Sequence, residues 1–196
     1  MVLKYRAPQM TINFLKSNFS GVPEQVQVLD VACGSGLVAK GMFELGFRNF
    51  VGVDSSKAML ELAAQTGFYR DLKLALLGPE PLPAPTGAYD VVILVGALDV
   101  GFAPVSVVRE LCQAAKPGGL VCIGRGNHKG VESDRYKTEL ETELQLMEDE
   151  GLWSRVDARE EDGYMMDVKA ETNATPEEAC ISGNLYLYRK SNAPDG

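Results

Sequence analysis

A set of glycines and aspartates lies in the first third of the chain. Gly34, Gly36 and Ala39 follow the apolar run "VLDVA" and match the pattern G-x-G-x-x-G/A. Asp30 precedes Gly34 by four residues, and Asp54 follows it by 20 at the end of the next apolar run. Glycines in such a loop let the backbone approach a nucleotide closely, and an acid at the later position accepts from ribose hydroxyls. We therefore expect this loop to bind a nucleotide.

Asp30 decides between two kinds of nucleotide. The pyrophosphate of a dinucleotide would bring anionic oxygens near this carboxylate, and such like charges repel by about 1 kcal/mol or more in a partly buried site. The ammonium and sulfonium groups of S-adenosylmethionine (SAM) are cations, which a carboxylate at the end of a strand favours. The sequence therefore favours SAM over a dinucleotide. The alternative interpretation is that Asp30 caps the loop by accepting from backbone N–H groups.

Strand-like and helix-like runs alternate along the chain, which is typical of a parallel sheet covered by helices. Strands are expected at 25–32, 49–54, 71–77, 89–96, 119–124, near 164–170 and at 184–190. The expected fold class is α/β, a Rossmann-like, seven-stranded, mostly parallel sheet with helices on both faces and an antiparallel last strand. Because ligands bind at the carboxyl ends of parallel strands, one crevice should form there. Its walls are expected at residues 30–37, 54–56, 77–79 and 95–99.

Length and composition indicate one globular domain. The chain has 196 residues, of which 45% are hydrophobic and 23% are charged. Within 1–196 we expect an N-terminal helical cover (1–24), a SAM-binding core (25–124) and substrate-side elements with the last strands (125–190). The formal net charge of −8 disfavours a nucleic-acid partner. Because no secretion signal or membrane-spanning run is found, we expect a cytoplasmic protein that could also enter the nucleus. We also expect a monomer.

No metal site is expected from the cysteines and histidine. The four cysteines form no C-x-x-C pair, and His128 is the one histidine of the chain. A structural zinc site needs four such ligands at short spacing. We interpret the cysteines as reduced thiols in mostly apolar surroundings, as in an intracellular protein. They are Cys33, Cys112, Cys122 and Cys180.

Four segments together resemble the motifs of the class I, seven-strand SAM-dependent methyltransferases. They are "LDVACGSG" (29–36), "VGVDSS" (51–56), "YDVVILVGAL" (89–98) and "LCQAAKPGGLVCIG" (111–124). The resemblance implies SAM as cofactor and S-adenosylhomocysteine (SAH) as product. It also implies which residues contact each part of SAM. Asp30 would lie at the methionyl end, over a loop of Ala32, Cys33, Gly34 and Gly36, and Asp54 would bind the ribose, bordered by Ser55 and Met59. Leu77 and Gly78 would lie beside the adenine, and Val95, Gly96 and Ala97 beside the sulfonium.

The chain departs from this family at two places. Many relatives carry an acid at the position of Gly78, where it accepts from the adenine amino group, whereas here the backbone or Glu80 would have to do so. The family also has a helix before the segment "KYRAP" that covers the cofactor, so we expect a short or missing cover. Tyr5 or Arg6 could reach the carboxylate of SAM, and an ordinary surface role is the alternative for both.

The candidates for catalysis are Asp99 and His128, which follow the fourth and fifth expected strands. Methyl transfer depends largely on alignment, and a base is needed only for poor nucleophiles. His128 has the chemistry of a base, but a solvated loop histidine is the favoured interpretation, and a helix cap is the alternative for Asp99. "GYMMD" (163–167) could line an apolar substrate pocket or fill the core. After the fourth strand the chain reads "VGALDV" and lacks the N/D-P-P-Y/F motif of amino methyltransferases.

Three functions remain open from the sequence. The favoured one is a SAM-dependent methyltransferase that acts on an unidentified small molecule or protein side chain. The second is a non-catalytic domain that binds SAM or SAH as a sensor or partner subunit. The third is an NAD-dependent oxidoreductase, which the glycine pattern alone would also allow.

Overall fold

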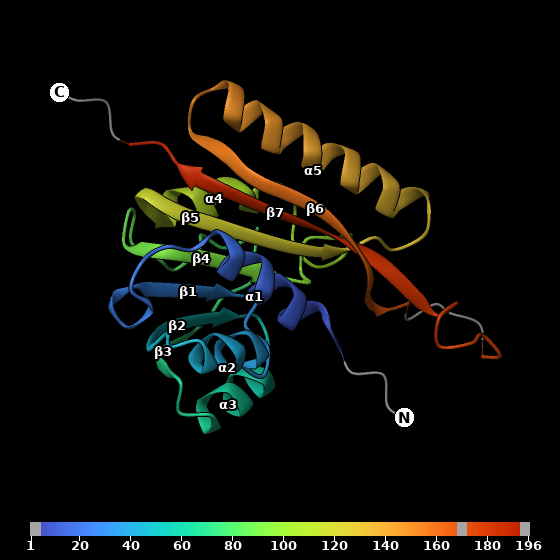
Figure 1. Ribbon diagram of the computed structural model, residues 1–196, viewed down its shortest axis with the longest axis horizontal. Helices are drawn as coiled ribbons and strands as arrows, with labels where there is room; N and C mark the ends of the chain where they lie inside the picture. Colours follow the sequence, from blue (N-terminus) through green and yellow to red (C-terminus); the bar gives the residue numbers. More distant parts are fainter. Residues whose placement is uncertain (1–4, 168–171, 193–196) are drawn as a thin grey trace.

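The computed structural model describes residues 5–167 and 172–192 and contains one sheet flanked by helices (Figure 1). The helices are α1 (Ala7–Asn18), η1 (Pro23–Gln25, a 3-10 turn), α2 (Leu37–Glu44), α3 (Lys57–Gln65), α4 (Val107–Ala114) and α5 (Val131–Asp149). The strands are β1 (Gln27–Val31), β2 (Asn49–Asp54), β3 (Tyr69–Leu74), β4 (Tyr89–Val95), β5 (Ala115–Gly126), β6 (Trp153–Met166) and β7 (Cys180–Lys190). The expected alternation of strands and helices is confirmed.

The sheet has seven strands in the order β3-β2-β1-β4-β5-β7-β6. The strands β1 to β5 are parallel, and β7 is antiparallel to both of its neighbours, β5 and β6. The expected mostly parallel sheet with an antiparallel last strand is therefore confirmed. The strand expected from 89–96 lies in the middle of the order, where its near-continuous apolar sequence is buried on both faces.

Two apolar layers cover the two faces of the sheet. On one face, α1 and α2 pack against inward side chains such as Val28 and Ile93. On the other, α4 and α5 pack against Leu29, Val31 and Leu94. Neighbouring residues of β1 thus enter opposite layers, as the two-residue period of a strand requires. In Figure 1, α1 and α2 lie in front of the strands and α4 lies behind them.

Several expected element boundaries are wrong. The strand expected near 164–170 is the end of β6, which already begins at Trp153, and residues 168–171 lie outside the described part. The strand expected at 71–77 runs instead from Tyr69 to Leu74. β5 continues past 124 to Gly126 because β7 pairs with it along that length, Arg125 lying opposite Asn184. These boundaries depend on partner strands that local sequence patterns do not reveal.

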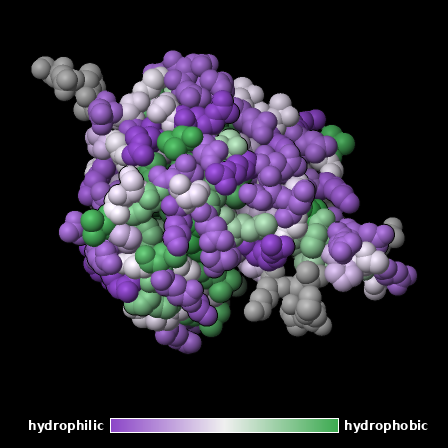
Figure 2. Space-filling model, viewed as in Figure 1, coloured by the Kyte–Doolittle hydropathy of each residue, from purple (hydrophilic) through white to green (hydrophobic). Residues whose placement is uncertain are grey.

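The part of the surface that carries α5 is predominantly hydrophilic (Figure 2). Two glutamates on α5 bind side chains of other elements. Glu141 accepts a hydrogen bond from the Tyr186 hydroxyl at 2.8 Å, and Glu143 forms an ion pair with Arg109. Within 5–167 and 172–192, none of the helices combines the length and apolar character needed to cross a membrane. Three of the four cysteines are buried, and all four are free thiols.

Candidate functional site

The loop between β1 and α2 lies where the strand order reverses direction. β1 has β2 on one side and β4 on the other, so the carboxyl ends of three parallel strands meet around this loop. The backbone N–H of Cys33 donates to the carbonyl of Val53 at 3.0 Å, and that of Gly34 donates to Asp54 Oδ2 at 2.9 Å. These two bonds join the predicted glycine loop to the end of β2. Open α/β sheets bind ligands at such a switch point.

The two glycines of the loop meet different needs. Gly34 and Gly36 have φ angles of +54° and +98°, in the region that favours glycine, and Ala32 has +56°. A Cβ on Gly36 would lie 3.3 Å from the ring of Tyr69, so close packing under the start of α2, together with the positive φ, disfavours a side chain there. A Cβ on Gly34 would meet no atom within 4 Å. Gly34 therefore leaves open space above the loop, where a ligand can approach the backbone.

The carboxylate of Asp54 accepts hydrogen bonds from two backbone segments, the glycine loop and the start of the turn before α3. Oδ2 accepts from Gly34, and Oδ1 accepts from the N–H of Ser56 at 2.8 Å. Since an ionised carboxylate has about four acceptor positions, two remain for a ligand's hydroxyls. Ser56 Oγ caps α3 by accepting from the N–H of Met59 at 3.3 Å. Ser55 and Met59 are exposed beside Asp54.

Asp30 is buried beneath the loop, with 1% of its surface exposed. Its Oδ2 accepts a hydrogen bond of 2.6 Å from the hydroxyl of Tyr69. Burial raises the pKa of Asp30 to about 7, the negative charge of Asp54 adds to this effect, and the Tyr69 hydrogen bond opposes it. The carboxyl group therefore changes its charge near neutral pH. A cation placed above the loop would favour its ionised form.

Sequence analysis missed Tyr69, which begins β3 and reaches back to β1. The ring passes over Gly52 of β2, where an added Cβ would lie 2.9 Å from Tyr69 Cε1 and 3.0 Å from Cys33 Sγ. A glycine inside an otherwise apolar strand often marks such a close approach. Gly52 within "NFVGVD" was thus the signal that a large side chain crosses β2 at this point.

The segment expected beside an adenine follows β3. Leu77 is buried, and Gly78 is exposed with a φ of +100° and lies against Pro104, whose Cγ would be 2.5 Å from an added Cβ. Glu80 uses its Oε2 to accept from the N–H of Leu76. Glu80, the carboxylate considered as a replacement for the missing acceptor of the adenine amino group, therefore stabilises its own turn.

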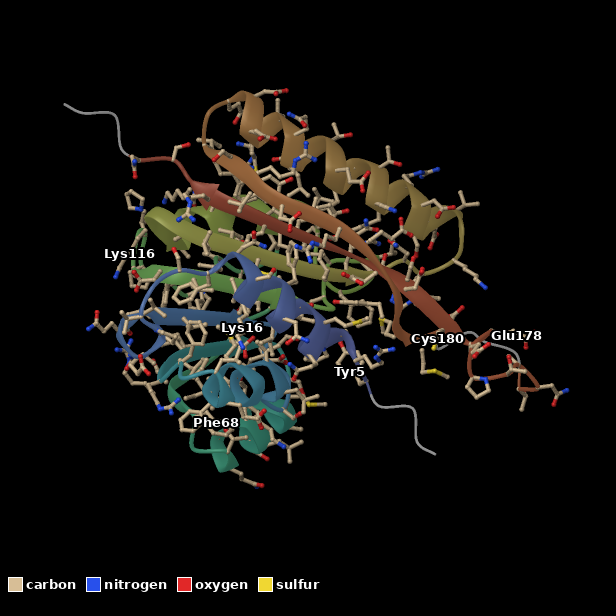
Figure 3. The ribbon with its side chains drawn as sticks, in the orientation of Figure 1. Tyr5, Lys16, Phe68, Lys116, Glu178 and Cys180 are labelled. Atoms are coloured by element: carbon tan, nitrogen blue, oxygen red, sulfur yellow. The ribbon has the colours of Figure 1, made fainter. Side chains whose placement is uncertain are left out.

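The residues expected to form the floor of the site lie at the end of β4 and directly after it, at Val95, Gly96 and Ala97. Gly96 has a φ of +85°, and its N–H donates to the carbonyl of Gly124 at 2.8 Å. A Cβ on Gly96 would lie 2.8 Å from the hydroxyl of Tyr5, which comes from the segment leading into α1 (Figure 3). Burial raises the pKa of Tyr5. Tyr5 thus lies over the floor.

The guanidinium of Arg6 lies elsewhere. Its Nη1 would lie 3.3 Å from a Cβ on Gly163, near the end of β6. Of the two N-terminal side chains considered for a cofactor contact, Tyr5 is therefore the one that the structure brings to the floor at Gly96.

A cavity of about 430 Å³ opens beside Gly96. It lies between the loop after β4, the loop after β5 and the first turn of α5. Met165 reaches it from β6, whereas Tyr164 is in the core, with its hydroxyl 3.3 Å from Thr11 Oγ1. The segment "GYMMD" therefore contributes to both the cavity and the core. The lining residues are Gly96, Asp99, Val100, Phe102, His128, Lys129, Gly130, Val131, Glu132, Ser133 and Met165.

Asp99 and His128 both line this cavity. Asp99 Oδ2 lies 3.9 Å from His128 Nε2, and Asp99 Oδ1 lies 3.5 Å from Nη2 of the buried Arg125. Asp99 Oδ1 also accepts from the N–H of Val100 at 2.8 Å. Because α4 begins only at Val107, the alternative of Asp99 as a helix cap is wrong.

Residues 29–123 match the family described as a methyltransferase domain. Residues 29–123 therefore form a methyltransferase domain. The human Methyltransferase-like protein 27 is 44% identical over 152 residues, which are 77% of this chain and 60% of that protein. The ribosomal protein L11 methyltransferase of Pseudomonas putida is 38% identical over 104 residues, which are 51% of this chain and 34% of that protein. The chain thus spans 60% and 34% of the lengths of these two methyltransferases.

Solved structures share the fold of this methyltransferase domain. An S-adenosylmethionine-dependent methyltransferase from Mesorhizobium loti superposes with a TM-score of 0.64 at 19% identity, over 91% of this chain and 96% of that chain. The MccD protein superposes with a TM-score of 0.67 at 15% identity, over 96% and 100%. The fold and the family together imply SAM as the cofactor.

The loop of this methyltransferase domain fits SAM. The space above Gly34 is open, Asp54 retains acceptor positions for ribose hydroxyls, and the buried carboxyl of Asp30 favours a cation over a pyrophosphate. Among the described residues, no group of three or more His, Cys, Asp or Glu side chains is arranged to hold a metal.

Proposed function

We propose that the protein transfers a methyl group from SAM to a small-molecule or protein side-chain acceptor held in the cavity beside Gly96. The observation that carries the proposal is the position of Gly96, which follows β4 at the predicted floor of the SAM site and also lines the cavity of about 430 Å³. A methyl donor and an acceptor can therefore meet there. Alignment of the two can supply much of the rate acceleration.

The chain's own residues would hold and orient SAM. In this proposal, the loop of Ala32, Cys33, Gly34 and Gly36 supports the methionyl chain, and Asp30 favours its cationic end. The adenosine lies on Asp54, Ser55 and Met59 and extends to Leu77 and Gly78, while Val95, Gly96 and Ala97 form the floor. SAM supplies an activated methyl group on a sulfonium. Tyr5, whose hydroxyl lies beside Gly96, contacts SAM from the side of α1 in this proposal.

The proposal also covers the class of acceptor, the oligomeric state and the location of the protein. The formal net charge of −8 supports an acceptor other than nucleic acid. The proposal includes a monomer of the cytoplasm or nucleus. Size-exclusion chromatography with light scattering at micromolar concentration tests the oligomeric state, and fluorescent tagging of the full protein in cells tests the location.

Calorimetry with SAM and SAH tests the proposed cofactor site. We expect both to bind the wild-type protein, and we expect Asp54→Ala to weaken binding at least tenfold, because it removes a charged acceptor worth about 1.5–3 kcal/mol. Asp71→Ala is the matched control, since Asp71 is an exposed aspartate of neighbouring β3. Absence of heat with either ligand, or equal affinity in Asp54→Ala, would contradict the proposal.

Transfer of the labelled methyl group of SAM tests the activity. The wild-type protein incubated with a cell extract should label at least one component, and Asp54→Ala should label it at least tenfold less. Binding of SAM without any transfer would favour the non-catalytic sensor or partner subunit. NADH that shifts the melting temperature where SAM does not would favour the oxidoreductase.

A further inference from the structure

A buried cation lies behind the cavity beside Gly96. Arg125 near the end of β5 is 1% exposed. Its Nε donates to the carbonyl of Leu98 at 3.0 Å, and its Nη1 donates to Asn127 Oδ1 at 3.4 Å. Nη2 makes no hydrogen bond to the described residues, and Asp99 Oδ1 lies 3.5 Å from it. Because an uncompensated buried charge is strongly unfavourable, Arg125 requires the carboxylate of Asp99 as its partner.

Arg125 fixes the carboxylate of Asp99 toward His128. One oxygen, Oδ1, faces the guanidinium and accepts from Val100, which leaves Oδ2 directed at His128 Nε2 at 3.9 Å. This distance exceeds a hydrogen bond, but catalytic hydrogen bonds are often long without substrate and shorten when it binds. The imidazole side chain is 21% exposed and borders the cavity. The three side chains therefore form a row from the core to the cavity, in the order Arg125, Asp99 and His128.

Several of the other side chains that line the cavity are apolar. Phe102 is 71% exposed and Val131 is 76% exposed, although both are large apolar side chains, and Val100 and Met165 lie beside them. Exposed apolar residues that gather at one cavity mark a surface for an apolar ligand. Lys129 and Glu132 carry opposite charges at the edge of the cavity, so the lining has no net preference for a charged ligand. The occupant that fits is a neutral, largely apolar molecule.

A base at the cavity, His128, indicates which kind of attacking group the acceptor carries. A thiol ionises readily and an aromatic amine is neutral at pH 7, so both can react without a positioned base. An aliphatic amine is a cation at pH 7, and the apolar side chains of the lining disfavour burial of its charge. A phenolic hydroxyl, with a pKa of about 10, is almost entirely protonated at neutral pH and needs one. We infer that the acceptor is an apolar phenol whose hydroxyl proton is taken by His128, with Asp99 and Arg125 as positioning residues. This inference rests on the proposed function.

The transfer balances without another reactant. His128 in its neutral form takes the hydroxyl proton, and Asp99 stabilises the resulting imidazolium. The acceptor oxygen forms the new O–CH3 bond as the methyl–sulfur bond breaks, and that electron pair stays on sulfur. His128 then returns its proton to water through the open side of the cavity.

The single histidine of the chain gives a direct test by NMR. In the SAH-loaded protein, 2-naphthol and 4-hydroxybiphenyl are titrated while the His128 imidazole signal is followed. We expect a saturable shift of that signal with the wild-type protein and with Asp71→Asn as control. Asp99→Asn should reduce the shift at least threefold, because His128 then loses its anionic partner. If neither phenol moves the signal at saturating SAH, the inference is overturned, whereas failure of SAH to bind overturns the proposed function itself.

The pH profile separates a base from a structural role. With labelled SAM and 2-naphthol at pH 7, His128→Gln should lower kcat about 100-fold, within the range of general-base catalysis, and change KM less than threefold. The loss should shrink as the pH approaches the naphthol's own pKa, because the phenolate then forms without a base. Arg125→Lys keeps the charge but loses the planar fork, so we expect a kcat about tenfold lower with unchanged SAH affinity. A loss that is the same at every pH would overturn the role of His128 as base.

Discussion

The N–H of Gly34 donates to Asp54 Oδ2 at 2.9 Å, so the acid at the end of β2 directly holds the glycine loop after β1. Two residues that are 20 positions apart in the sequence therefore act as one unit. A ligand that binds the free side of the Asp54 carboxylate also stabilises the loop, because both use the same side chain. This coupling underlies the proposed SAM site.

Gly34→Ala tests the open space above the loop. An alanine at a φ of +54° is strained by about 1–2 kcal/mol, and its methyl group would occupy the proposed path of the methionyl chain. We expect SAM affinity to fall at least tenfold by calorimetry. Gly67→Ala is the matched control, since Gly67 has a φ of +73° with no atom within 4 Å of an added Cβ but lies at the end of α3. Equal affinity in the two variants would contradict a ligand above Gly34.

Asp30 should make stability depend on pH below neutrality. Its pKa is raised from 3.8 to about 7 by burial, so the folded protein retains a proton that the unfolded chain has already lost between these values. The contribution of Asp30 to the free energy of unfolding is therefore full below pH 4 and is lost as the pH rises through 7. Urea denaturation of wild type and Asp30→Asn from pH 4 to 8 measures the difference. A difference that is independent of pH would contradict the raised pKa.

Tyr69→Phe tests the hydrogen bond beneath the loop. Its hydroxyl lowers the pKa of Asp30, so its loss should raise that pKa further and weaken the binding of the cationic SAM at pH 7 more than at pH 8.5. The free energy of unfolding at pH 7 should fall by about 1–3 kcal/mol because a buried acceptor loses its donor. Tyr186→Phe is the control, since it also removes a hydroxyl-to-carboxylate bond, to Glu141 at 2.8 Å. Equal effects on SAM affinity in both variants would be evidence against the pair with Asp30.

Trp153 should report on the packing of β6 against α5. Its Nε1 donates to the carbonyl of Leu144 at 3.2 Å, and its ring stacks on Tyr188 at 4.3 Å between centroids. Trp153→Ala should lower the free energy of unfolding by about 3–5 kcal/mol, as for other buried aromatic residues. Chemical denaturation measures this, and a loss below 1 kcal/mol would contradict the packing.

The strands and the glycine loop could be predicted because their signals are local. The run 89–96 is apolar enough to identify the central strand, and the ends of the expected strands place 30–37 and 54–56 in one crevice, where Gly34 and Asp54 are in contact. Arg125 could not be recognised as a buried residue, because it lies on a strand only through pairing with Asn184, some 60 residues later. His128 likewise resembles an ordinary loop residue until the fold brings Asp99 beside it. Such contacts depend on chain segments whose pairing is set by the whole sheet.

A structure of the protein with SAH bound tests the central claim most directly. We predict that both ribose hydroxyls lie within hydrogen-bonding distance of Asp54 and that the sulfur lies over Gly96 and faces the cavity lined by Asp99 and His128. A nucleotide bound away from Asp54, or a sulfur directed away from that cavity, would contradict the account.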